Sequence, residues 1–230
     1  MVPIAGWQIL RPLPPKFSES EFAVTRTRRT LIHYRYLDET PVGRLLLAGS
    51  DEGLRFLKFE GRFEPNRCPL PPKPGQNDGR DVWRADTGHL DEAVRQLKAY
   101  FAAELTKFDL PLAPHGTDFQ RKVWSALLGI PWGETMTYGE VAREIGQPTA
   151  SRAVGLANGR NPVSIIIPCH RVIGSNGKLV GYGGGLVQKQ FLLQLERSWP
   201  VSRQPPLSLL DARNTHESSD VPAKIIGTHG

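Results

Sequence analysis

The segment TYGEVAREIGQPTASRAVGLANG, residues 137–159, decides the fold that this sequence predicts. Thr137 and Glu140 have the spacing of a capping box, in which both side chains satisfy free amides at the start of a helix. That helix is expected to stop at Gly146, and a second one to run from about residue 149 to 157. Two short helices joined by a tight, glycine-containing turn indicate a helix-turn-helix, although a generic helical hairpin fits the same pattern.

A longer helix is predicted before this pair. Thr117 and Gln120 form another capping-box pattern, and apolar residues recur at helical spacing until PWG at residues 131–133. In the helix-turn-helix reading, Arg152 falls in the first turn of the second short helix, where a recognition helix meets duplex DNA. A solvated surface arginine is the alternative reading of that residue.

The segment NPVSIIIPCHRVIGSNGKLVGYGGGL, residues 161–186, follows the helices. Its apolar run VSIIIP at 163–168 predicts a short buried strand, and Asn176-Gly177 is typical of a hairpin turn. Three consecutive glycines at 183–185 allow a ligand to approach the backbone closely. A last helix is expected between Leu186 and Glu196.

The first hundred residues predict a small α+β domain. Strands are expected at about 31–37, 43–49 and 54–60, and a helix follows whose apolar face includes Leu97 and Tyr100. The predicted organisation is an irregular N-terminal arm at 1–28, an α+β domain at 29–112 with a loop insertion at 61–82, a second domain at 113–199, and a disordered tail at 200–230.

The charge, the apolar runs and the cysteine content of the chain exclude few classes of function. The net charge of +6 is compatible with a polyanionic partner, and residues 117–199 hold nine Lys and Arg against five Asp and Glu. No run of about 20 apolar residues predicts a membrane span, and the N-terminus lacks the pattern of a secretory signal. Because the two cysteines do not make a disulfide framework, a reducing cytoplasm is expected.

Cys169 has three possible readings from its surroundings. No C-x-x-C spacing accompanies it, so a structural zinc site is not expected, and Cys68 reads as a bystander. A buried structural cysteine is common among free thiols. However, the nearby His170, Arg171 and either Lys178 or Lys189 form a basic neighbourhood, which lowers the pKa of a thiol and favours a nucleophile.

A nucleophilic Cys169 needs a base. Neighbouring side chains of a regular strand point to opposite faces, so Cys169 and His170 could not pair directly without a bend, whereas a water relay between them is easier to build. Glu196 is a candidate carboxylate to orient the imidazole. From these residues alone, a Cys-His hydrolase stays open.

Several motifs in one register carry a resemblance. Pro168-Cys169-His170-Arg171 is followed by Val172-Ile173-Gly174, with TYGEVA and SRAVGLANGRNP before it and GYGGGL after it. Together they resemble the O6-alkylguanine-DNA alkyltransferase family, densely over about 117–197 and loosely over 31–110. The resemblance implies a small N-terminal α/β domain with a short antiparallel sheet, and a mainly helical C-terminal domain of winged helix-turn-helix type.

The resemblance also implies an activity. Family members take an alkyl group from the O6 of guanine in double-stranded DNA, with O4-alkylthymine an open second substrate, and keep it on their own cysteine. One molecule would repair one lesion irreversibly, with no cofactor and no metal, as a cytoplasmic monomer with no membrane partner. A sensor that binds alkylguanine without transfer and a Cys-His hydrolase are the rival functions.

Residue roles follow from the same resemblance. Cys169 would accept the alkyl group, His170 would deprotonate it through a water, Glu196 would orient His170, and Asn161 would support the reactive turn. The residues expected to bind the substrate base are Tyr138, Val172, Tyr182, Gly183 and Lys189.

The DNA is expected in the minor groove, with the target guanine flipped out of the stack. Arg152 matches the arginine finger that fills the gap left by the base. The other positions expected near DNA are Gln120, Gly139, Gln147 and Ser175. Ser164 and Gly183 depart from some relatives and are expected to widen the pocket, and the zinc ligands of some members have no evident counterpart.

Overall fold

The computed structural model describes residues 30–60 and 81–196. The predicted arm at 1–28, the predicted tail at 200–230 and most of the 61–82 loop lie outside these residues. Within the described residues, no helix is long and apolar enough to span a membrane.

The N-terminal half is built on a four-stranded sheet in the order β3-β2-β1-β4. Strands β1, β2 and β3 pair antiparallel, while β4 pairs parallel to β1. The strands are β1 (Thr30–Leu37), β2 (Leu45–Ser50), β3 (Gly53–Phe59) and β4 (Asp81–Ala85). The three predicted strands are therefore confirmed to within two residues.

The sequence pattern does not predict the fourth strand. The loop insertion expected at 61–82 includes residues 81 and 82, but these two residues begin β4. This short segment, DVWRA, lies at the edge of the sheet and has no buried residue, so it lacks the apolar alternation that identifies a strand with one buried face.

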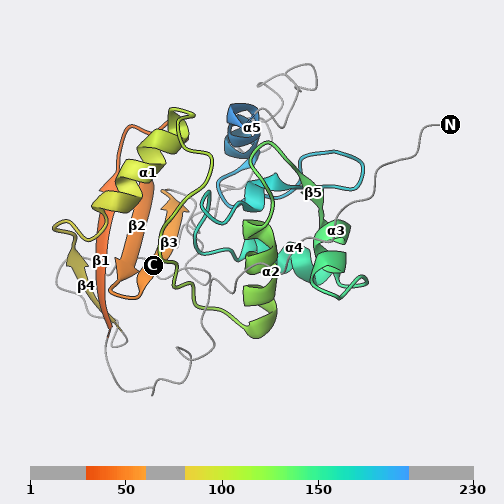
Figure 1. The fold of residues 1–230 in the computed structure, drawn as a ribbon, viewed down its shortest axis with the longest axis horizontal. Helices are drawn as coiled ribbons and strands as arrows, with labels where there is room; N and C mark the ends of the chain where they lie inside the picture. Colours follow the sequence, from red (N-terminus) through yellow and green to blue (C-terminus); the bar gives the residue numbers. More distant parts are fainter. Residues whose placement is uncertain (1–29, 61–80, 197–230) are drawn as a thin grey trace, which may run out of the picture.

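Helix α1 (Asp91–Phe101) packs against one face of the sheet, as Figure 1 shows. Leu97 and Tyr100 on its apolar face are fully buried and belong to a core shared with β2 and β3. That core continues into the helices of the C-terminal half, so the two halves are packed together.

The C-terminal half begins with the helices that the capping boxes predict. In both boxes the threonine hydroxyl and the side chain three residues later make the expected bonds, at Thr117 with Gln120 and at Thr137 with Glu140. The helices are α2 (Asp118–Leu128), α3 (Tyr138–Glu144), α4 (Ser151–Gly159) and α5 (Leu186–Leu195).

The turn between α3 and α4 depends on Gly146. Its φ of 72° is in the left-handed region, which glycine adopts without a steric cost. The amides of Gly146 and Gln147 donate to the carbonyls of Arg143 and Ala142, and these two bonds close the end of α3. The predicted helix-turn-helix is confirmed, with α4 starting and ending two residues later than expected.

Residues 163–168 are not the predicted strand. They form a buried turn in which the Ile167 amide donates to the Val163 carbonyl at 3.0 Å and Ile165 has a φ of 71°. Only an isolated bridge between Val163 and Leu57 resembles strand pairing. A continuous apolar run fits any fully buried segment, so the composition could not distinguish this turn from a strand.

The turn leads directly into a single turn of 3-10 helix, η2 (Cys169–Arg171). The strand geometry expected for Cys169 and His170 is therefore wrong. A two-residue strand β6 (Val172–Ile173) follows and pairs parallel with β5 (Met136–Thr137). The turn at Asn176-Gly177 is present, with the Gly174 amide on the Lys178 carbonyl, but no second hairpin strand follows it within the described residues.

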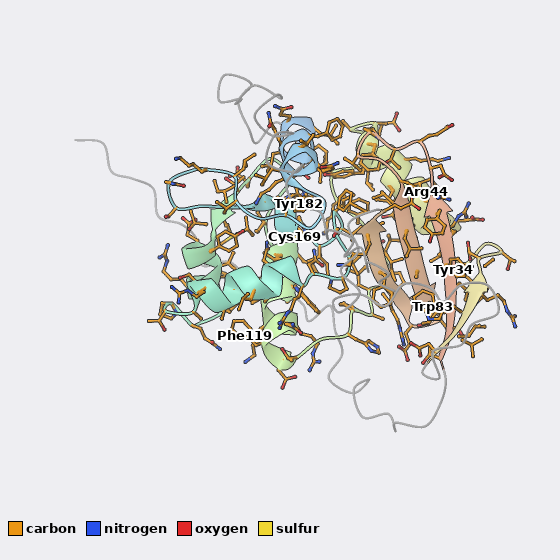
Figure 2. All side chains as sticks on the ribbon, turned by 180° about the vertical axis from the view of Figure 1, so that it is seen from behind. Tyr34, Arg44, Trp83, Phe119, Cys169 and Tyr182 are labelled. Carbon is orange, nitrogen blue, oxygen red and sulfur yellow. The ribbon has the colours of Figure 1, made fainter. Side chains whose placement is uncertain are left out.

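Figure 2 labels Cys169 and Tyr182 in the helical half, near the middle of the molecule. The rings of Tyr182 and Phe59 of β3 make an edge contact with centroids 5.6 Å apart. A Cβ at Gly184 would lie 2.6 Å from the Phe59 ring, so only glycine allows this loop to rest on the sheet so closely. The region around Cys169 is thus built from both halves of the chain.

Candidate active site

Cys169 is buried, with 3% of its surface exposed, and its sulfur accepts a hydrogen bond from Asn161 Nδ2 at 3.0 Å. Burial raises the pKa of the thiol, while the Asn161 bond and the charges of Lys58 and Lys189 oppose that rise. The expected net lowering of this pKa is therefore wrong. In this structure the neutral thiol is favoured, and a base must remove its proton.

Asn161 holds the backbone that presents Cys169. Its Oδ1 accepts from the Val163 amide at 3.0 Å, and its Nδ2 also donates to the Ile167 carbonyl at 2.8 Å. Both bonds lie within the turn that leads to Cys169. The same amide group closes the turn and contacts the sulfur, so the position of the thiol is coupled to the shape of the turn.

His170 is fully buried and its Nε2 lies 2.9 Å from Glu196 Oε1. Burial opposes ionisation of Glu196, but hydrogen bonds from His170 and Arg171 outweigh it and lower its pKa to about 2. The carboxylate is an acceptor, so the histidine nitrogen that faces it carries the proton. Burial also lowers the pKa of His170, which favours the neutral imidazole.

The other nitrogen of His170 is then a free base. Nδ1 is buried and makes no hydrogen bond within the described residues. No hydrogen bond joins His170 to Cys169 in that same part of the chain, so a direct Cys-His pair is not formed. Glu196 thus lies on the Nε2 side of His170, and the basic lone pair is on Nδ1.

Arg171 and Tyr100 also contact Glu196, and neither contact is predicted by the sequence. Arg171 donates to both carboxylate oxygens at 2.7 and 2.9 Å, and to the Ile130 carbonyl at 2.5 Å. The Tyr100 hydroxyl, on α1 of the N-terminal half, donates to Glu196 Oε1 at 2.7 Å. Arg171 belongs to the reactive motif but has no assigned role there, whereas the pattern around Tyr100 indicates only an apolar helix face.

Lys58 is a second contribution from the sheet. Its ammonium group donates to the Asn161 carbonyl at 2.5 Å, and its positive charge acts on the Cys169 thiol. The lysines that the sequence points to near Cys169 are Lys178 and Lys189. Of these two, Lys189 acts on the thiol, and the alternation of β3 alone gives no signal for Lys58.

Lys189 is fully buried and ties down the segment after β6. Its Nζ donates to the carbonyls of Val172 at 2.6 Å and Val180 at 2.8 Å. Burial lowers its pKa to about 8. The Val172 carbonyl, expected to accept from the substrate base, therefore already accepts from Lys189 and keeps one lone pair for another donor.

Tyr138 and Tyr182 come to the Cys169 region from different segments of the chain. The Tyr138 hydroxyl lies 3.4 Å from the Val180 carbonyl, and burial raises its pKa, so it remains a hydrogen-bond donor. The Tyr182 ring stands edge-on to His170 with centroids 6.3 Å apart, and its hydroxyl is buried without a described partner. The Tyr138 hydroxyl thus has one long contact, and the Tyr182 hydroxyl has no partner among the described residues.

Gly183 and Ser164 are the two positions expected to widen a substrate pocket. Gly183 lies in the loop before α5, and a Cβ there would contact nothing within 4 Å, so a larger side chain would fit. Ser164 is buried in the turn, where its amide donates to the Leu57 carbonyl at 2.9 Å.

The residues expected near DNA lie mainly on the helix-turn-helix. Arg152 is exposed at the second position of α4, and Gln147 is exposed in the turn before it. Gly139 is half-buried in the first turn of α3, and Ser175 is exposed after β6. Gln120 differs because its Oε1 accepts from the Thr117 amide at 2.9 Å, which commits part of the side chain to the helix cap.

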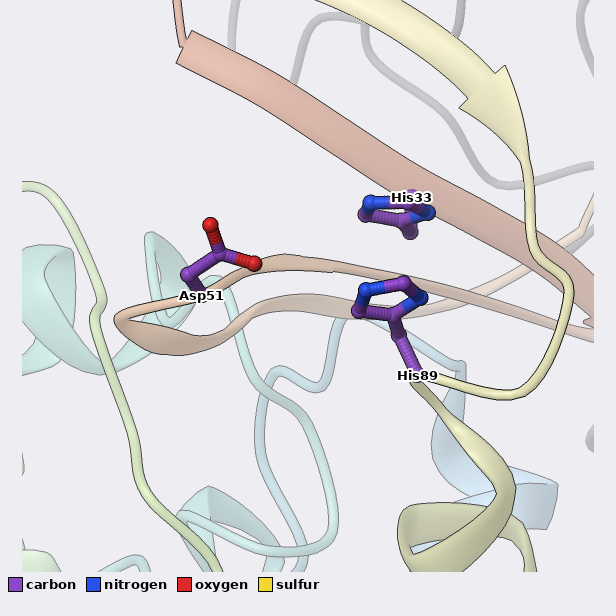
Figure 3. A group of neighbouring side chains, drawn as sticks. All are labelled: His33, Asp51 and His89. Carbon is purple, nitrogen blue, oxygen red and sulfur yellow. The ribbon is translucent and has the colours of Figure 1, made fainter.

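One group of side chains has metal-ligand chemistry. Figure 3 shows His33, Asp51 and His89. Their ligand atoms lie within 4.8 Å of one another. However, the two imidazole rings are stacked, with centroids 3.6 Å apart and planes 16° apart. Nitrogen lone pairs lie in the ring plane, so nearly parallel rings do not converge on one ion. This geometry favours a stacked histidine pair over a metal centre.

Two family models match the chain. Residues 118–198 match the 6-O-methylguanine DNA methyltransferase DNA-binding domain, and residues 32–114 match the ribonuclease-like domain of the same proteins. A methylated-DNA–protein-cysteine methyltransferase of Methanosarcina acetivorans is 53% identical over 165 residues, 72% of this chain and 99% of that protein. One from Mycobacterium tuberculosis is 54% identical over 73% of this chain and 94% of that protein.

Solved structures agree with these matches. Mycobacterium tuberculosis OGT in complex with DNA has a TM-score of 0.62 at 52% identity, over 72% of this chain and 93% of that one. The O6-methylguanine-DNA methyltransferase of Pyrococcus kodakaraensis has a TM-score of 0.51 at 23% identity over 72% and 98%, which shows the shared fold. Together the two family models match most of the chain, which belongs to the 6-O-methylguanine DNA methyltransferase family.

Proposed function

We propose that this chain repairs DNA by direct reversal of damage, as a methylated-DNA–protein-cysteine methyltransferase. It takes the alkyl group of O6-alkylguanine in duplex DNA onto Cys169, once per molecule and without a cofactor. The observation that carries the proposal is Cys169 itself, held by Asn161 beside a neutral His170 whose basic nitrogen is free among the described residues. O4-alkylthymine remains an open second substrate.

The transfer is a displacement at an sp³ carbon. The Cys169 proton passes to His170 Nδ1, through a water in our proposal, and the thiolate then attacks the alkyl carbon. A sulfur–carbon bond forms while the carbon–oxygen bond breaks, and the electron pair leaves with guanine. The product is a thioether that thiol exchange cannot reverse, so each molecule acts once.

The leaving guanine carries developing negative charge, which needs a donor. Tyr138 is our candidate because its hydroxyl is a donor at neutral pH and its described contact, at 3.4 Å, is long. The remaining proposed base-binding positions are Val172, Tyr182, Gly183 and Lys189. Tyr182 would supply an aromatic wall, and Lys189 would hold the carbonyls around the base in place.

The DNA is proposed to bind through its minor groove with the damaged guanine flipped out. A base inside the stack cannot reach a cysteine that is 3% exposed, so extrusion is a chemical requirement. Arg152, exposed at the start of α4, is proposed to fill the gap in the duplex. Gln120, Gly139, Gln147 and Ser175 remain proposed DNA contacts, and the protein is proposed to act as a monomer.

The boundary between the two domains is proposed to lie near residues 112 and 113. It falls between α1 and α2, where Leu54 on the sheet exchanges backbone hydrogen bonds with Pro111 and Ala113.

The rival functions are weaker on chemical grounds. A Cys-His hydrolase predicts repeated turnover instead of one stoichiometric event, and a sensor without transfer does not need the acceptor Cys169.

The test uses duplex DNA that carries one O6-methylguanine. After incubation, intact-protein and peptide mass spectrometry should find a gain of one methylene unit on Cys169, in a stoichiometric amount. Cys169→Ser is the control. No gain in the native protein, or a gain that persists in this variant, contradicts the proposal, and repeated turnover would support a hydrolase instead.

A further inference from the structure

We infer that Tyr100, a residue of the sheet domain, is a positioning residue for the reaction at Cys169, because its hydroxyl fixes the carboxylate that orients His170. The inference rests on the function proposed above and adds a member to its catalytic network. It also gives the N-terminal half an influence on the reaction, exerted through Glu196 and His170.

The contact is short and buried. Tyr100 Oη lies 2.7 Å from Glu196 Oε1, and the two residues are 0% and 1% exposed. The same oxygen faces His170 Nε2 at 2.9 Å. The Tyr100 phenol and the His170 imidazole, from different halves of the chain, therefore donate to the same carboxylate oxygen. Moving either donor changes the hydrogen bond that the other donor makes with this oxygen.

Tyr100 is held so that its hydroxyl has little freedom. Its ring contacts Phe101 and Phe108, and it meets Trp132 edge-on with centroids 5.3 Å apart. Trp132 lies in the loop after α2, so aromatic packing clamps the ring between the two halves. A rigid donor loses little conformational entropy when it bonds, which makes it suited to aligning a catalytic group.

The hydroxyl also tempers the charge of Glu196. Burial raises the pKa of Tyr100, so it stays a phenol and donates at all pH values of interest. A hydrogen-bond donor on Oε1 reduces the effective negative charge that the carboxylate presents to His170. A smaller negative charge stabilises the protonated imidazolium form of His170 less. Tyr100 thus helps to keep His170 neutral and able to accept the thiol proton.

The sign of the effect depends on every charged or titratable group near His170. Glu196 at the end of α5 favours its protonated form, while Arg171 beside it and Lys189 on α5 disfavour that form. Loss of the Tyr100 hydroxyl strengthens the stabilisation of protonated His170 by Glu196, while the opposing charges of Arg171 and Lys189 stay in place. The charged groups that act on His170 are Glu196, Arg171 and Lys189. Tyr182 stands edge-on to its ring, Cys169 precedes it in the chain, and Tyr100 acts on it through Glu196.

The experiment compares the intact protein with Tyr100→Phe, which removes one oxygen and keeps the packed ring. Single-turnover transfer from free O6-benzylguanine is followed across pH, with the adduct mapped to Cys169. The acidic limb should move to higher pH, with roughly 3- to 10-fold slower transfer near pH 6. Tyr34→Phe is the matched control, because Tyr34 lies at the far side of the sheet (Figure 2).

A second readout does not depend on transfer. The ¹⁵N resonances of the His170 ring report its tautomer and its titration, and Tyr100→Phe should raise the pKa of His170. An unchanged pH profile and titration, with only a lower melting temperature, would overturn the inference and leave Tyr100 a packing residue. If the unaltered protein transfers nothing, the proposed function fails, while the ring resonances still decide the role of Tyr100.

A variant of opposite sign covers the case in which Tyr100→Phe does not fold. Site-specific 3-fluorotyrosine at position 100 keeps the ring and makes the phenol a stronger donor. The pKa of His170 should then fall, and the acidic limb should move to lower pH. The absence of any shift with this residue contradicts the inference as well.

Discussion

Asn161 and Cys169 are joined by a hydrogen bond from the side-chain amide to the sulfur, 3.0 Å long, across a turn that the same amide closes. The bond places a neutral donor on the atom that must carry negative charge during the reaction. Support of the backbone and stabilisation of a thiolate are therefore two effects of one side chain, and they can be separated by experiment.

Asn161→Ala should lower both stability and transfer rate. It leaves the Val163 amide and the Ile167 carbonyl without their buried partner, which we expect to cost about 2–4 kcal/mol of unfolding free energy. Chemical denaturation and single-turnover alkylation measure the two effects. The control is Asn158→Ala, since Asn158 is also buried but approaches only the Cys169 carbonyl, at 3.5 Å. Equal losses in both variants would contradict a specific role for Asn161.

Lys58→Met should slow transfer at neutral pH without removing any residue from the C-terminal half. The Lys58 charge opposes the rise in the Cys169 pKa, so its loss leaves less thiolate, and we expect a rate roughly 3- to 10-fold lower. The measurement is transfer from free O6-benzylguanine between about pH 6 and 9. Lys58→Arg keeps the charge and should stay near the native rate. A Met variant that matches the native profile would show that the charge is irrelevant.

Arg152→Ala should separate DNA handling from chemistry. The side chain is exposed on α4 and contacts no catalytic residue in the described hydrogen bonds, so transfer from a free base should be almost unaffected. Repair of O6-methylguanine in a duplex should slow by one to two orders of magnitude, roughly the effect of losing a few kcal/mol. Arg160→Ala, at the other end of α4, is the charge-matched control. Equal slowing with the free base and the duplex would rule out a role in base extrusion.

Glu196 makes stability depend on pH in acid. Its pKa falls from the ordinary value of 4.5 to about 2 in the folded protein, so its contribution to stability is complete above about pH 4.5. As the pH falls from 4.5 toward 2 that contribution is lost, and the difference amounts to about 3 kcal/mol. Denaturation of the native protein and Glu196→Gln across this range isolates the effect. A pH dependence as steep in the variant as in the native protein would assign it to other carboxyl groups.

Features that depend on neighbouring residues can be predicted from the sequence. Both capping boxes and the turn at Gly146 are formed by contacts between residues a few positions apart. The local pattern of residues is therefore nearly sufficient to predict them. The family resemblance assigns Asn161, His170 and Glu196 to one network, and the structure places them in contact with one another or with Cys169.

Features that depend on distant or fully buried contacts cannot be predicted in this way. Tyr100 and Glu196 are 96 positions apart, and a tyrosine on an apolar helix face gives no sign of where its hydroxyl points. The turn at 163–168 has the composition of a strand because burial on all sides removes the periodicity that separates the two. The expected pKa of Cys169 is wrong because nearby cations are visible in a sequence and burial is not.

The close approach of Gly184 to Phe59 has a practical consequence for engineering. The helical half cannot be transferred to another sheet domain unchanged. Its loop at Gly184 packs against the Phe59 ring of the sheet, and its Glu196 accepts a hydrogen bond from Tyr100. Chimaeras made by joining the sheet of one relative to the helices of another should work only when the residues at 59 and 184 are exchanged as a pair. The size of one side chain in the first half therefore constrains which loops the second half can accept.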